Sequence, residues 1–345
     1  MVCPAPYGID AKDTFGKTGM SQEEVIAAIA DEVLKERIRQ GELVEDLFDG
    51  LGDCFLKDDA HGQPLYELLQ GDWSLFHDDR GKDLIDKALA GREMDSQALV
   101  VYAPEIEEAV GLWDGAKQQL IGEYRYFGAE DLKDSTYIDS MLSVREEELG
   151  ANVALYRARI NGERRKRAFN KKEMGAPPAD KATAGRANPM GIPFLYLCDE
   201  PETTLYEVRA RYLDNVSIAE FCSSQAVKVV DFCKKVSLFA PAYDDDLPHA
   251  MASERLAKLI TADLSKPMSR YDSEVDYVPT QFLCELIRKT HDVAGIVFNS
   301  SLRKGHKNFV LFNTQAMEAR SAKMYTVTSV QISAEKPKRA GTSQL

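Results

Sequence analysis

The stretch IPFLYLCDEPETTLYEVRA (192–210) predicts a buried strand followed at once by a short helix. The apolar run at 192–197 is short, which is typical of a strand inside a sheet. Proline is favoured at the first position of a helix, so the helix is expected to begin at Pro201, with Glu202 in its first turn. This strand–helix unit is the centre of a region that mixes strands and helices.

Outward from this unit, further apolar runs predict more strands. They are rich in Val, Ile, Leu and Phe, and YVPTQFLCELIRKT (277–290) places a helix between two of them. A basic and then Gly/Pro/Ala-rich stretch, 161–191, predicts an exposed loop. Strands and short helices without strict alternation favour an α+β fold over a doubly wound sheet. The expected strands are ALYRARI (154–160), AVKVVDF (226–232), GIVFNS (295–300), NFVLF (308–312) and MYTVTSVQIS (324–333).

The N-terminal half is predicted to be mostly helical. Apolar residues recur at helical spacing in three stretches, 21–41, 104–127 and 140–148. Residues 1–150 contain 34 acidic and 14 basic residues, whereas residues 151–345 contain 22 acidic and 29 basic residues. This change of charge predicts a domain boundary near residue 150. The expected divisions are an acidic helical domain at 1–150, a second domain at 151–335 and a disordered tail at 336–345.

Composition excludes several classes of protein. Of the 345 residues, 44% are hydrophobic and 29% are charged, as in an ordinary globular protein. No window approaches the ~18 apolar residues of a membrane span, and the first residues lack the pattern of a secretory signal peptide. The six scattered cysteines form no CxxC pair, which favours reduced thiols and a cytoplasmic location. Phosphate-loop, dinucleotide-loop, zinc-protease and serine-hydrolase motifs are absent, and no metal site is predicted.

Polar residues within or just after the apolar segments are candidates for a site. Arg157 lies in the strand ALYRARI, where a charge needs a partner or a ligand. Glu207 lies in the helix that follows the strand containing Tyr196. Taken singly, a buried Arg and a buried Glu more commonly pair with each other than bind a substrate. The candidates are Arg157, Arg186, Asn188, Tyr196, Glu207, Ser300 and Ser301.

Four segments in a fixed order resemble the RES domain, which is named for its Arg, Glu and Ser. They are LYRAR (155–159), GRANPMGIPFLYLCDEPETTLYEVRA (185–210), YVPTQFLCELIR (277–288) and GIVFNSSLRKGHKNFVLF (295–312). The likeness covers roughly residues 151–315. The acidic half resembles the helical HEPN-type domain that often precedes RES domains. It lacks the ribonuclease motif of that group, so the resemblance implies a helical accessory domain that neither cleaves nor binds RNA.

The RES resemblance implies a fold similar to ADP-ribosyltransferases and a toxin-type enzyme that consumes NAD⁺. By their place in the motifs, the residues that it marks as catalytic are Glu207, Ser300 and Tyr196. Those that it marks as substrate-binding are Arg157, Arg186, Tyr196 and Ser301. Ser301 is the adjacent alternative to Ser300, because Asn299 stands where the family often has a proline.

These residue types suit the chemistry. Breaking the nicotinamide–ribose bond develops positive charge on the ribose, which Glu207 can stabilise. Arg157 and Arg186 offer planar donors to a diphosphate, and Tyr196 can stack on a flat ring. Ser300 can bind the nicotinamide amide or orient the nucleophile. NAD⁺ is therefore expected as a substrate, with no cofactor.

An NAD⁺ glycohydrolase or phosphorylase of toxin or defence type is the first hypothesis. The alternatives are an ADP-ribosyltransferase that modifies a macromolecule and a catalytically inactive partner-binding protein. An antitoxin or immunity protein is the expected kind of partner, while nucleic acid and membranes are not expected, and a homo-oligomer stays open. The acidic half is expected to restrict NAD⁺ entry, to bind a neutralising partner or to form a dimer.

Overall fold

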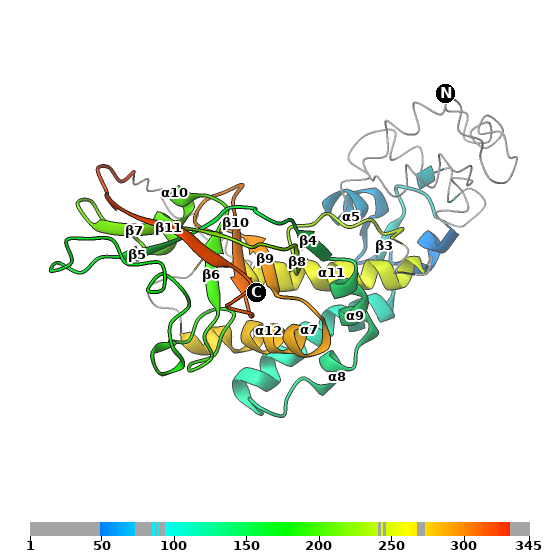
Figure 1. The fold of residues 1–345 in the computed structure, drawn as a ribbon. Coiled ribbons are helices and arrows are strands. Elements are labelled where there is room, and N and C mark those ends of the chain that lie inside the picture. Colours follow the sequence, from blue (N-terminus) through cyan, green and yellow to red (C-terminus); the bar gives the residue numbers. More distant parts are fainter. Residues whose placement is uncertain are drawn as a thin grey trace, which may run out of the picture.

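The computed structural model describes residues 49–72, 85–86, 89, 94–240, 243, 246–267 and 273–331. The helix expected at 21–41 and the tail expected at 336–345 lie outside the described residues. Figure 1 shows a large sheet with helices packed against it, and a smaller group of elements around α5 and β3 at one end.

Within the described residues, eight strands form the large sheet, in the order β11-β7-β5-β6-β10-β9-β8-β4 (Figure 1). Neighbouring strands are antiparallel except β8 and β9, which are parallel. This mixed sheet with its separate group of helices confirms the α+β prediction. The strands are β4 (Glu146–Leu149), β5 (Leu155–Ile160), β6 (Leu195–Cys198), β7 (Asn215–Cys222), β8 (Val227–Asp231), β9 (Gly295–Asn299), β10 (Lys307–Leu311) and β11 (Glu318–Thr326).

The strand from which the prediction started, β6, lies inside this sheet between β5 and β10. Tyr196 is paired with Val310 of β10. Because side chains alternate along a strand, Leu195 and Leu197 enter the core on one face, and Tyr196 points to the other. The face with Tyr196 is the one that carries the long helices.

Three long helices cover that face of the sheet. Leu256 of α11 and Leu283 of α12 share one buried cluster with Ile296 and Val310 of the sheet. Trp113 of α7 belongs to the same cluster and is fully buried. The α-helices are α5 (Leu65–Asp72), α7 (Pro104–Gly122), α8 (Glu130–Lys133), α9 (Thr136–Ser143), α10 (Pro201–Glu207), α11 (Leu247–Leu264) and α12 (Val278–Thr290). Short 3₁₀ helices are η1 (Asp49–Cys54), η3 (Ala179–Lys181) and η5 (Glu274–Tyr277).

A smaller sheet occupies the N-terminal part of the described chain. Its strands β1 (Phe55–Lys57), β2 (Gln63–Pro64) and β3 (Leu99–Tyr102) are antiparallel, with β3 in the middle. Phe55 and Val100 of this sheet pack in one buried cluster with Leu247 and Met251 of α11. The N-terminal half therefore contains strands as well as helices, which the helical spacing of its apolar residues did not predict.

Most of the predicted elements are present, but one is wrong and another is displaced along the chain. The helix expected at 140–148 ends earlier, because α9 stops at Ser143 and Glu146–Leu149 forms β4, paired with β8. Glutamate favours helices in isolation, and pairing with β8 overrides that preference here. The final strand spans Glu318–Thr326 instead of 324–333, and β7 and α11 were not predicted.

The expected boundary at residue 150 does not coincide with a division of the packing. β4 ends at Leu149 and is a strand of the large sheet. The buried Arg145 donates to both carboxylate oxygens of Glu254 in α11, at 2.8 and 2.5 Å. Residues on the two sides of position 150 therefore share one core in the described chain, and the charge change near that position marks no gap between them.

Candidate functional site

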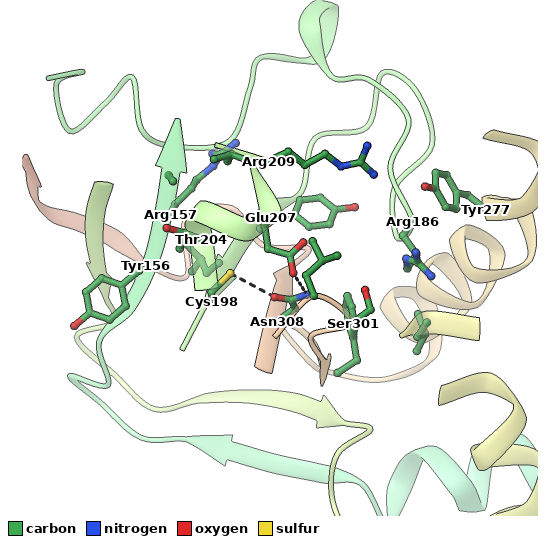
Figure 2. Close-up of a pocket in the computed structure, with 17 residues that line it drawn as sticks. Tyr156, Arg157, Arg186, Cys198, Thr204, Glu207, Arg209, Tyr277, Ser301 and Asn308 are labelled. Atoms are coloured by element: carbon green, nitrogen blue, oxygen red, sulfur yellow. Dashed lines mark hydrogen bonds between the residues drawn. The ribbon is translucent and has the colours of Figure 1, made fainter. Parts of the chain in front are cut away.

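A pocket of about 460 Å³ opens where α10, the end of β9 and the loop before β6 meet. Its volume lies in the range of small-molecule sites. Five sequence candidates line it, namely Arg157, Arg186, Tyr196, Glu207 and Ser301. Figure 2 shows Glu207 in the middle of the lining residues, with Arg157 to one side and Arg186 beside Tyr277 on the other. The structure thus brings together residues that are up to 144 positions apart in the sequence.

Glu207 is the carboxylate of this pocket. It is the last residue of α10 and is exposed. Its Oε1 accepts hydrogen bonds from Ser300 Oγ at 2.9 Å and from Asn308 Nδ2 at 2.9 Å. Two neutral donors thus fix one oxygen of the carboxylate, and within the described chain no hydrogen bond engages the other. A carboxylate held in this way is oriented and still open to a ligand.

Ser300 lies behind Glu207, outside the pocket lining. It is 6% exposed, and its hydroxyl donates to Glu207 while accepting from the backbone N–H groups of Leu302 and Arg303 at 3.3 Å each. These bonds use the hydroxyl fully. The geometry therefore makes Ser300 a support for Glu207, and Ser301 is the serine that lines the pocket.

Asn308 was missed in the sequence, although it lies in the NFVLF strand. Its amide donates to Glu207, and its Oδ1 accepts from Cys198 Sγ at 3.4 Å (Figure 2). In the sequence it resembles any polar residue at the start of a strand. Its register opposite Cys198 in β6 is what places it beside the carboxylate.

Arg157 enters the pocket from β5. Its Nη1 donates to the backbone carbonyl of Met174 at 3.1 Å and to that of Gly175. Burial, with the nearby charge of Arg159, lowers the pKa of Arg157 to about 10, so the side chain is still charged at neutral pH. Among the described residues no carboxylate forms an ion pair with it. A half-buried cation without an acidic partner is a suitable contact for an anionic ligand.

Arg186 reaches the pocket from the loop at 182–191, which we call the Arg186 loop. Its Nη1 donates to the carbonyl of Asp263 at 2.6 Å, and its Nη2 donates to that of Lys266, just past the end of α11. The guanidinium carbon lies 5.5 Å from the ring centre of Tyr277. Burial lowers the pKa of Arg186. The side chain therefore lines the pocket and also satisfies carbonyls at a helix end.

The Arg186 loop is held by Asn188 and Tyr196. The Asn188 amide donates to three backbone carbonyls of the loop region, and its Oδ1 accepts from Tyr196 Oη at 2.7 Å. The same Oη accepts from the N–H of Ala187 at 3.2 Å. A Cβ at Gly185 would lie 2.7 Å from both Asn188 Oδ1 and Tyr196 Oη, so only glycine fits there. The Tyr196 hydroxyl is thus engaged by the loop, and its ring borders the pocket.

Three further residues of the lining, Tyr156, Tyr277 and Arg209, were not singled out in the sequence. Tyr156 and Tyr277 add aromatic rings at opposite ends of the pocket (Figure 2). Arg209 follows α10 with a φ of 51°, and this left-handed turn keeps the chain at the pocket after Glu207. Three arginines and one carboxylate therefore line the pocket, which favours a ligand with net negative charge and flat rings.

The model of the RES domain matches residues 154–332, which is just over half of the chain. The chain belongs to the RES family. RES domains are associated with toxins that act on NAD. The RES match includes every residue described above that lines the pocket or supports Glu207. No curated protein and no solved structure matches the chain.

The residues before the RES domain lie outside this match. The HEPN-type resemblance of residues 1–150 therefore stays a prediction, as does the likeness to ADP-ribosyltransferases. Among the described residues, no cluster of three or more His, Cys, Asp or Glu side chains could hold a metal ion. None of the described helices is both long and apolar enough to cross a membrane.

Proposed function

We propose that this protein binds NAD⁺ and breaks its nicotinamide–ribose bond, with water or phosphate as the nucleophile. The observation that carries the proposal is the carboxylate of Glu207. It stands among three arginines, with one oxygen fixed by Ser300 and Asn308. A fixed anion next to cationic and aromatic side chains suits a dinucleotide, which has two phosphates and two flat rings.

The proposed reaction needs few groups from the protein. The bond between the ribose C1′ and the nicotinamide nitrogen breaks, and its electron pair goes to the nicotinamide ring, which becomes neutral. Positive charge develops on the ribose and is stabilised by Glu207. An oxygen of water or phosphate then forms the new bond to C1′, and a water nucleophile releases its proton to solvent. The leaving group needs no proton, which fits a pocket lined by one carboxylate, Glu207, among the described residues.

The substrate contacts follow from the pocket. Arg157 and Arg186 each use part of the guanidinium to hold backbone carbonyls, so their remaining N–H groups would contact the diphosphate. The rings of Tyr156, Tyr196 and Tyr277 would border the bases. As a toxin-type enzyme, the protein would be neutralised in its own cell by an antitoxin or immunity protein.

The test is incubation of the full-length protein with NAD⁺, with and without phosphate, followed by identification of the products. Free nicotinamide with ADP-ribose indicates hydrolysis, and a phosphorylated ADP-ribose indicates phosphorolysis. Glu207→Gln keeps the size and removes the charge, so turnover should fall by about a thousandfold. Glu163→Gln, at an exposed loop position, is the matched control and should have normal turnover. Intact NAD⁺ under all conditions would contradict the proposal. In a parallel incubation with labelled NAD⁺ and cell lysate, transfer of the label to a macromolecule would favour a transferase.

A further inference from the structure

A line of hydrogen bonds joins α7, which precedes the RES domain, to the candidate pocket. Trp113 Nε1 donates to Asp263 Oδ2 at 2.7 Å, and Lys117 Nζ donates to the same oxygen at 3.3 Å. The backbone carbonyl of Asp263 accepts from Arg186 Nη1 at 2.6 Å. Asp263 therefore contacts α7 with its side chain and a pocket residue with its main chain.

The α7 end of this line is firmly fixed. Trp113 is fully buried, and a buried indole N–H is costly to leave without an acceptor. Lys117 is shared between Asp114 at 2.8 Å and Asp263 at 3.3 Å. Both donors lie one turn apart on α7, so they hold the last turn of α11 at a defined distance from that helix.

The Arg186 end of the line has room to move. Arg186 borders the 460 Å³ pocket and also a neighbouring cavity of about 200 Å³, which Lys117, Asp263 and Tyr277 line as well. A long side chain between two cavities is directed by its anchors, and two of these anchors are the carbonyls of Asp263 and Lys266. A shift of the end of α11 would move both carbonyls and so change where the guanidinium lies between the two cavities.

We propose that Trp113 and Asp263 are positioning residues, through which α7 directs Arg186 into the pocket. Under this proposal, residues outside the RES match complete the binding site of the domain. The part that concerns NAD⁺ rests on the proposed function, whereas the part that concerns Arg186 does not. Both parts can be tested with the full-length protein.

The first experiment is amide hydrogen exchange of the Arg186 loop without any ligand. The N–H groups of Gly185, Ala187 and Gly191 are bonded within this part of the fold, so their exchange reports on its opening. Asp263→Leu removes the acceptor for Trp113 and should raise their exchange by about tenfold. Asp263→Asn keeps an acceptor oxygen and should restore protection.

Two further variants keep this experiment decisive. Trp113→Phe removes the indole donor together with part of a buried ring and should also raise exchange in the Arg186 loop, which tests the proposal even if Asp263→Leu does not fold. Asp114→Asn changes a carboxylate on the same turn of α7 that contacts Lys117 but not Asp263, and should leave the loop protected. Two results would overturn the proposal. One is unchanged exchange of the Arg186 loop in Trp113→Phe, and the other is exchange in Asp263→Asn that is as fast as in Asp263→Leu.

The second experiment measures NAD⁺ turnover in the same variants. Misdirection of Arg186 weakens binding, so KM should rise by about tenfold in Trp113→Phe while kcat changes by less than about twofold. In an Arg186→Ala background, Trp113→Phe should have no further effect on KM, because the residue through which it acts is gone. If the two substitutions raised KM additively, Trp113 would not act through Arg186. Loop loosening without NAD⁺ turnover in the wild-type protein would contradict the proposed function and leave the positioning role standing.

Discussion

The carboxylate of Glu207 is held by uncharged groups. Ser300→Ala would remove one of the two bonds to Oε1 and would also free the N–H groups of Leu302 and Arg303. A displaced catalytic group costs about a hundredfold in rate, so we expect kcat to fall by that amount with a smaller change in KM. Steady-state kinetics on NAD⁺ would measure this, with the exposed Ser224→Ala as control. A large rise in KM at unchanged kcat would show instead that Ser300 contacts the substrate.

Removal of the Tyr196 hydroxyl is expected to lower the stability of the protein. Tyr196→Phe leaves Asn188 Oδ1 and the Ala187 N–H without their partner in a closely packed loop. The expected loss is about 1–3 kcal/mol of unfolding free energy, measured by urea denaturation. Burial raises the pKa of this tyrosine, so its hydroxyl stays protonated at neutral pH and acts as a donor. A variant with unchanged stability but no turnover would assign the hydroxyl to the chemistry.

At the scale of elements, one arginine joins the Ser300 loop to the start of α10. Arg303 donates to Glu200 and to Glu202, each at 2.7 Å, and both carboxylates are largely exposed. Exposed ion pairs contribute at most about 1 kcal/mol to stability. Arg303→Met should therefore barely change the melting temperature while reducing turnover by about tenfold, because Ser300 and Glu207 are carried by the two joined segments. Equal losses of stability and turnover would contradict this role.

The helices and strands also show how much of the fold can be predicted from the sequence alone. The strand–helix unit of β6 and α10 was predicted because its apolar run and its proline act locally. α11 was missed because it is buried by neighbours on several sides, including at Ser253 and Glu254, so its apolar residues follow no single stripe. β7 was missed because the buried Ser217 looks polar, although its hydroxyl is bonded to Asn161.

For the candidate site, too, the sequence predicted what depends on local motifs and missed what depends on distant contacts. Arg157, Arg186, Tyr196, Glu207 and Ser301 were named from motifs and do line one pocket. What the sequence could not supply was which atoms are already engaged by the protein, as for the hydroxyls of Ser300 and Tyr196. Those hydrogen-bond partners come from loops and strands far apart in the chain, so no local sequence pattern predicts them.

At the scale of the whole molecule, the buried pair of Arg145 and Glu254 ties the segment before residue 150 to α11. Tyr243 also donates to this carboxylate, and the ion pair helps to raise the pKa of Arg145. Arg145→Met leaves a buried charge without a partner, so we expect a loss of about 3–5 kcal/mol in denaturant unfolding. Lys133→Met, which breaks an exposed pair with Glu130, should cost less than about 1 kcal/mol. If both variants lost little unfolding free energy, the charge of Glu254 would be neutralised or solvated in another way when Arg145 is absent.

The shared core also decides how the acidic half can be studied. A chain that begins at residue 151 lacks β4 and α7, and would expose the apolar residues that contact Trp113. We expect this fragment to bind a hydrophobic dye and to lose its cooperative unfolding transition. A stable, cooperative fragment would show that the halves fold separately. Charge substitutions in the full chain are therefore the better test of whether the acidic half restricts NAD⁺ entry.

The glutamates of β4 have one more consequence. Among the described strands, β4 and β11 are the outermost of the large sheet, where an uncovered backbone can pair with other molecules and start aggregation. β4 carries Glu146, Glu147 and Glu148 in succession, and β11 carries charged side chains such as Arg320 and Lys323. Repulsion between like charges disfavours the approach of a second β4 edge. We therefore expect the same residues that mislead a helix prediction to disfavour self-association through this edge at high concentration.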